Sequence, residues 1–209
     1  MIPMTEEERQ LLQSVLPHKP GRNDNSQDHI EEALRQLRSA KDYLDRKYPG
    51  VPLVFHTFDP QTKMTERGFA LVSVKGKSAV YRVLIRRAGD RYICSDTLYS
   101  EFIREQYDAA LEQCLLPFAG PVKVHTVFHT PAGEKINADT PLSAVLAHQP
   151  RLVRHTDIYT EMPFGNEEEL MKKLREGGFY GSYTVFLGDE KEFSFLEFRV
   201  QSERKNETV

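Results

Sequence analysis

Three short segments rich in β-branched and aromatic residues follow one another between residues 68 and 94. They are GFALVSV (68–74), SAVYRVLIRR (78–87) and RYIC (91–94). The intervening KGKS and AGD are tight enough to be hairpin connections, so the segments are predicted to be antiparallel neighbours. Runs of consecutive strands favour an α+β fold over a doubly wound α/β fold.

Further strands are expected along the rest of the chain, where apolar residues alternate or cluster in short runs. They are VPLVFHTFD (51–59), VKVHTVFHT (122–130), RLVRHTDIYTE (151–161), SYTVFL (182–187) and EFSFLEFRV (192–200). Residues 188–191, Gly-Asp-Glu-Lys, join the last two segments and predict another hairpin.

Apolar residues at three- and four-residue steps predict two long amphipathic helices. The first is capped by Ser26 and runs to about Lys47. The second begins at Asp96 or Thr97 and ends before Pro117, because proline cannot continue the helical hydrogen bonding. Capping residues predict shorter helices after Thr5, after Thr140 and over 167–176.

These elements predict an α+β protein with a mainly antiparallel sheet of about six to eight strands, flanked by three to five helices. Residues 1–25 are expected to form an N-terminal helix and a mobile linker. The halves 26–120 and 121–201 are expected to share one continuous domain, and 202–209 reads as a polar tail.

Composition narrows the classes of function. The 209 residues carry a net charge of −3, whereas a nonspecific nucleic-acid binder normally has a basic excess. No apolar run approaches the roughly 18 residues that a membrane-spanning helix needs. The segment MIPMTEEERQLL lacks the features of a secretory signal, so a cytoplasmic protein is expected if Met1 is the true start.

Residues 27–116 contain a long predicted helix ending in YLDRKYPG, then VPLVFHTFD, further strands, and a helix rich in Tyr and acidic residues. This part of the chain resembles modules found in Gram-positive bacterial proteins of unknown function. In those modules a helix ending in a Tyr-Leu-x-x-Lys-Tyr-Gly segment precedes a curved antiparallel sheet of broadly cystatin-like order. Here Pro49 stands between Tyr48 and Gly50, which departs from that pattern. The resemblance implies a binding or scaffolding module and assigns no catalytic residue.

Four residues are candidate metal ligands: His125, His129, His155 and Asp157. His125 and His129 would share one face of a strand but lie about 13 Å apart, too far for two ligands of one zinc ion. His155 and Asp157 share a face of a later strand, so a site requires that the two strands pair. The alternative is a solvated strand face.

A candidate anion-binding or RNA-binding patch consists of Arg82, Arg86, Arg87 and Arg91. The alternative is an exposed sheet face whose charges prevent edge pairing. Cys94 and Cys114 form no CxxC pair, and Cys94 is interpreted as a buried structural cysteine rather than a nucleophile.

The chain contains no GxSxG, HExxH, P-loop, EF-hand or protein-kinase motif. We therefore expect a non-enzymatic, protein-binding or scaffolding module that needs no cofactor and that binds a partner protein or forms a homodimer. The first alternative is a small-molecule or metal-binding protein, or a hydrolase, which uses the His/Asp cluster. The second is RNA or anion binding by the arginine-rich hairpin.

Overall fold

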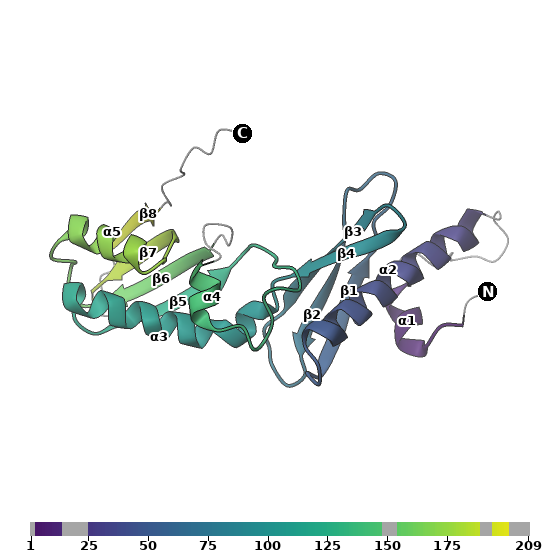
Figure 1. Ribbon diagram of the computed structural model, residues 1–209, viewed down its shortest axis with the longest axis horizontal. Coiled ribbons are helices and arrows are strands. Elements are labelled where there is room, and N and C mark those ends of the chain that lie inside the picture. The colour runs from purple at the N-terminus through teal and green to yellow at the C-terminus, as the bar shows by residue number, and fades with distance from the viewer. Residues whose placement is uncertain (1–2, 14–24, 148–153, 189–193, 201–209) are drawn as a thin grey trace. The chain divides into compact units, whose positions relative to one another are not determined.

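The computed structural model describes residues 3–13, 25–147, 154–188 and 194–200. The protein has an α+β fold, as predicted (Figure 1). Its helices are α1 (Glu6–Leu11), α2 (Asn25–Lys47), α3 (Tyr99–Ala119), α4 (Leu142–Ala147) and α5 (Glu167–Glu176). Its strands are β1 (Leu53–Asp59), β2 (Gly68–Val74), β3 (Tyr81–Ala88), β4 (Arg91–Asp96), β5 (Val122–Phe128), β6 (Arg154–Thr160), β7 (Gly181–Leu187) and β8 (Ser194–Val200).

The strands form two four-stranded sheets. Sheet A has the order β1-β2-β3-β4 and is antiparallel throughout. Sheet B has the order β5-β6-β7-β8, in which only β6 and β7 are parallel. That parallel pair follows from α5, which lies between β6 and β7 in the chain and returns it to the same end of the sheet.

The chain divides into two compact units. The first contains Met1–Leu98 with Pro131–Ala138, and the second contains Tyr99–Thr130 with Asp139–Val209. The expected single domain over 26–201 stays a prediction. The expected linker lies almost wholly, and the polar tail entirely, outside the described residues.

In the first unit, α2 packs on one face of sheet A. Its buried apolar residues recur at helical spacing, as the sequence predicted: Ala33, Leu34, Leu37, Ala40, Tyr43 and Leu44. They meet the inward side chains of the sheet, including Ala70 and Val72 on β2 and Val83 and Ile85 on β3. Side chains alternate between the faces of a strand, so the residues between these point to the other face.

A buried ion pair joins α2, β4 and the segment 131–138. The Lys47 Nζ donates to Asp96 Oδ2 at 2.7 Å and to the Ala132 carbonyl at 3.0 Å. The hydroxyls of Tyr43 and Tyr48 donate to Asp96 at 2.6 and 2.8 Å. The Tyr, Lys and Tyr of YLDRKYPG therefore hold this unit together.

In the second unit, α3 lies along β5, the edge strand of sheet B. Carboxylates of α3 accept hydrogen bonds from the outward-facing backbone: Glu112 from Val124 N at 3.2 Å, and Asp108 from Thr126 N at 3.4 Å. These contacts occupy N–H groups that would otherwise be open to pairing with another strand.

The predicted boundaries of α3 were wrong at both ends. Asp96 belongs to β4, and the Thr97 amide bonds to the Arg82 carbonyl, so the helix starts only at Tyr99. Pro117 lies inside the last turn, and its side of the helix is exposed. The last helical residue is Ala119, and Gly120 follows it with a φ of 68°, a conformation that favours glycine.

By contrast, the predicted helix starts at Thr5 and Asn166 are confirmed. Thr5 and Glu8 form the reciprocal box at the start of α1, and α5 spans the predicted 167–176 with Asn166 as its cap. Among the described helices, none combines the length and the apolar character needed to span a membrane.

Candidate functional site

The face of sheet A opposite α2 carries large apolar side chains together with arginines. Strand alternation and register place Val54, Phe69, Leu71, Leu84, Ile93, Arg82, Arg86 and Arg91 on it, and we call this set the arginine face. Ile93 is 49% exposed and Val54 38% exposed, while Phe69, Leu71 and Leu84 are half-buried. Val54 and Ile93 lie on the two edge strands, β1 and β4, and Phe69, Leu71 and Leu84 lie on the strands between them. A single exposed apolar side chain is ordinary, whereas large apolar patches are rarer on protein surfaces.

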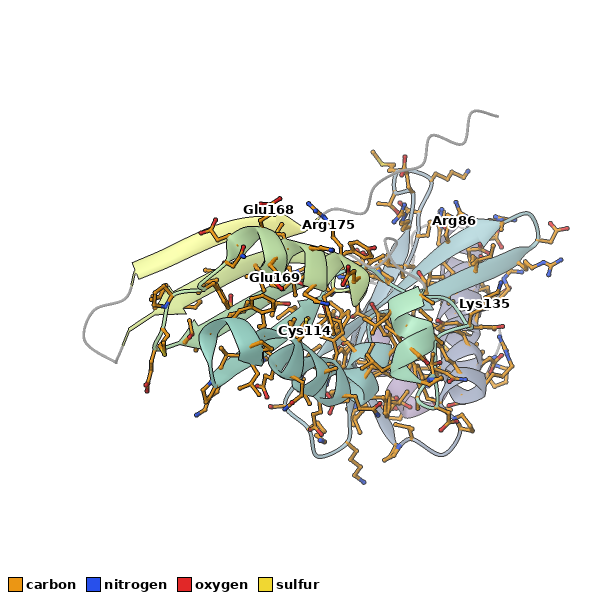
Figure 2. The ribbon with its side chains drawn as sticks, turned by 60° about the vertical axis from the view of Figure 1, so that its left-hand side comes forward. Arg86, Cys114, Lys135, Glu168, Glu169 and Arg175 are labelled. Atoms are coloured by element: carbon orange, nitrogen blue, oxygen red, sulfur yellow. The ribbon has the colours of Figure 1, made fainter. Side chains whose placement is uncertain are left out.

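The three arginines of this face are exposed and, in the part of the chain that the structure describes, form no ion pair with a carboxylate. The Arg82 guanidinium lies over the Phe69 ring, 5.8 Å from its centre, within the range of a cation–π contact. Figure 2 shows Arg86 on its strand. Asp59, directly opposite Phe69, is the one acidic residue in register with the face along the described strands.

Arg87 does not belong with the other three arginines of the predicted patch. Its Nη1 lies 3.5 Å from Glu32 Oε1 of α2, on the covered side of the sheet. Glu32 also accepts a hydrogen bond from Tyr92, which, with Arg35 and Arg87, lowers the pKa of its carboxyl group. Arg87 is therefore a structural partner of α2.

The outer face of sheet B holds a hydrogen-bonded polar cluster around His155. Its Nδ1 lies 2.8 Å from Ser182 Oγ, and its Nε2 lies 3.1 Å from Asp157 Oδ1 and 3.2 Å from Thr184 Oγ1. β5 and β6 pair in a register that sets His125 opposite Asp157 and Val127 opposite His155. The strand pairing that the histidine hypothesis required is therefore present.

This cluster is not arranged as a metal site. Across residues 3–13, 25–147 and 154–188, no group of three or more His, Cys, Asp or Glu side chains could hold a metal ion. His129 lies one residue beyond the paired part of β5 and is exposed. Ser182 and Thr184, which bond to His155, were not singled out from the sequence, because alternating Ser and Thr are common on the wet face of any strand.

Aromatic and aliphatic side chains lie beside the polar cluster. The rings of Tyr159 and Phe186 stack, with centroids 4.9 Å apart and an interplanar angle of 11°. Tyr159 is 44% exposed and Val127 41% exposed. The outer face of sheet B is thus mixed, with one His/Asp pair and no cluster of basic residues among its described side chains.

A groove of about 480 Å³ runs between α3 and α5 in the second unit. It is lined by Gln113, Cys114, Pro117, Phe118, Gly165, Asn166, Glu169 and Lys173. Figure 2 labels two of the lining residues, Cys114 on α3 and Glu169 on α5. Burial raises the pKa of the Cys114 thiol, so the thiol is protonated near neutral pH and is a poor nucleophile.

Cys94 is buried, as expected, on the inner face of sheet A. Burial raises the pKa of its thiol to about 11, so no thiolate is available for chemistry near neutral pH.

Comparison with known proteins returns no relative: no protein-family model, no curated protein and no solved structure is significantly similar to this chain. The fold defines the class, an α+β protein with one antiparallel and one mixed sheet. The cystatin-like order stays a prediction.

Proposed function

We propose that the protein is a non-enzymatic binding module whose arginine face binds an acidic, amphipathic segment of another protein. The proposal rests on one observation. The same face of sheet A exposes Ile93 and Val54 and carries three arginines that have no acidic partner among the described residues. An interface of this kind gains affinity from apolar contact and specificity from charge complementarity.

The chemistry of the face favours an acidic protein segment over a nucleic acid. Single-stranded nucleic acids bind to platforms of several aromatic rings in a basic groove. The arginine face has a single aromatic ring, Phe69, surrounded by aliphatic side chains, and the chain as a whole carries a net charge of −3. Arginine is also the basic residue most enriched in protein interfaces.

Site-specific photocrosslinking tests the proposal. A photoreactive amino acid at position 93 should crosslink a defined acidic segment of one protein, identified by mass spectrometry. The same amino acid at position 64 is the control, because Met64 is 97% exposed and lies outside the face, in the β1–β2 connection.

The identified segment should then bind the purified protein, and Arg82→Glu with Arg86→Glu should weaken binding at least tenfold. Equal yields from positions 93 and 64 would refute the proposal, as would crosslinks to RNA alone. A crosslink to a second copy of the chain, lost in the double variant, would replace the acidic partner by a homodimer.

A second candidate function, hydrolysis of an activated ester, is favoured by the hydrogen bonds of His155. If Nε2 donates to Asp157, Nδ1 accepts the Ser182 proton, which is the arrangement of a general base beside a nucleophile. A fluorophosphonate probe should then label Ser182, with no labelling in Ser182→Ala and unchanged labelling in His125→Gln. Failure of the probe to label the native protein would remove this candidate.

A further inference from the structure

Arg154, the first residue of β6, is fully buried in the core of the second unit and lacks a counter-ion among the described residues. Its Nη2 donates to the Gly178 carbonyl at 2.8 Å. Its Nε and Nη1 are buried without any hydrogen-bond partner in the described structure. A guanidinium remains charged in proteins, and a buried charge without a partner costs several kcal/mol.

Aromatic rings surround the guanidinium but do not neutralise it. Its Cζ lies 4.7 Å from the ring centre of Tyr107 and 6.0 Å from that of Phe128. Burial raises the pKa of Tyr107 to about 12 against the opposing influence of Arg154, so this hydroxyl stays neutral near pH 7. Cation–π contact is favourable but leaves the N–H donors in the guanidinium plane unsatisfied.

A second unsatisfied donor lies in the same cluster. Tyr107 Oη is buried close to the Tyr183 hydroxyl and the Arg154 guanidinium, both of which influence its pKa, but it forms no hydrogen bond of normal geometry in the described structure. The neighbouring Tyr183 hydroxyl is already committed, because it donates to the Phe179 carbonyl at 2.6 Å. Asp108 Oδ2 accepts from the Thr126 amide of β5 at 3.4 Å, while its Oδ1 is buried without a hydrogen-bond partner in the described structure, and the carboxylate forms no ion pair with Arg154 there. Among the described residues, therefore, no carboxylate is paired with the buried guanidinium.

The backbone keeps this region tight around the arginine. A Cβ at Gly181 would lie 2.9 Å from the Arg154 carbonyl oxygen and 3.0 Å from its Cγ, so β7 can approach only as glycine. The cluster is thus held in place from β6, from β7 and from α3, which carries Tyr107. Such preorganisation is what a selective polar site requires.

We propose that Arg154 and Tyr107 form a buried binding site for a small monovalent oxyanion of the carboxylate class. One buried positive charge is balanced by one negative charge, whereas a dianion would leave an excess charge in the core. The guanidinium N–H groups donate to the carboxylate oxygens, and the Tyr107 hydroxyl supplies a further donor. This inference is independent of the arginine face.

Because Arg154 is fully buried, the anion enters through local opening of the unit and exchanges slowly. Acetate is the probe. The midpoint of thermal unfolding is measured in sodium acetate, sodium chloride and sodium sulfate at equal ionic strength. We expect a saturable rise with acetate. Chloride should give no such rise, and sulfate only the non-saturable rise that follows from its exclusion from the protein surface.

Two variants separate the site from a general salt effect. Tyr107→Phe removes a hydroxyl without a partner in the described structure, so it should fold normally and bind acetate about five- to tenfold more weakly. Tyr180→Phe, whose hydroxyl bonds only weakly to the Arg175 carbonyl at 3.3 Å, is the matched control and should keep the full response. Arg154→Met should fold and lose the response entirely.

The proposal is overturned if acetate and chloride give the same midpoint for the native protein. It is also overturned if Tyr107→Phe and Arg154→Met respond to acetate as the native protein does. In either case the buried donors are satisfied by water alone.

Discussion

The Lys47–Asp96 ion pair offers a sharp test of what holds the first unit together. Both side chains are fully buried, and Lys47 Nζ has three acceptors: Asp96, the Tyr43 hydroxyl and the Ala132 carbonyl. Asp96→Asn keeps the shape of the carboxylate but removes its charge. The buried Lys47 ammonium then loses the carboxylate that lies 2.7 Å from its Nζ.

The expected loss is about 3–5 kcal/mol, the usual cost of leaving one member of a buried pair uncompensated. Lys47→Met should cost a similar amount, because it leaves the Asp96 carboxylate with only tyrosine hydroxyls among the contacts described above. The double variant removes both charges of the pair. It should therefore be more stable, by about 2 kcal/mol or more, than the sum of the single losses predicts.

Urea unfolding, followed by circular dichroism and tyrosine fluorescence, measures all three variants; the chain has no tryptophan. Asp45→Asn, an exposed change on the same helix, is the control and should stay within about 0.5 kcal/mol of the native protein. A loss below about 1 kcal/mol for Asp96→Asn would refute the reasoning, and so would strict additivity in the double variant.

Two further outcomes follow from the first unit. Hydrogen bonds from Arg38 lower the pKa of Glu8 from 4.5 to about 2, so the contact of α1 with α2 should be intact above pH 4.5 and be lost as the pH falls towards 2. Glu8→Gln should remove this acid dependence and cost about 2 kcal/mol, seen as faster proteolysis of α1 at neutral pH. Gly68→Ala should destabilise by about 1–3 kcal/mol, because its Cβ would lie 2.5 Å from the Gln61 backbone nitrogen. Gly133→Ala, with open space at its Cβ, should be close to neutral in the same urea titration.

Local chemistry made several elements predictable from the sequence. Asn166, the acidic first turn and the following basic residues define α5, because capping and helix-dipole effects act within one turn. The hairpins of sheet A were equally predictable from the sequence, because the short turns at Gly76 and Gly89 join strands that pair directly with each other.

Long-range pairing was not predictable in the same way. Asp96 looked like a helix cap, yet its role is set by Tyr43 and Lys47 of α2 and by Tyr48 just after that helix, all far away in sequence. In RLVRHTDIYTE both strand faces carry polar residues, so nothing in the pattern marks Arg154 as the buried one. The His125–Asp157 register likewise depends on which strands become neighbours.

The discontinuous make-up of the first unit has a consequence for synthesis. The ribosome finishes residues 1–98 before it has made Pro131–Ala138, which belongs to the same unit. Until Ala132 emerges, Asp96 lacks its antiparallel bridge partner and Lys47 lacks one of its acceptors. While α3 and β5 of the second unit are translated, the nascent first unit therefore lacks the contacts that Ala132 makes with Lys47 and Asp96. A chain truncated at residue 98 would remain in that state permanently.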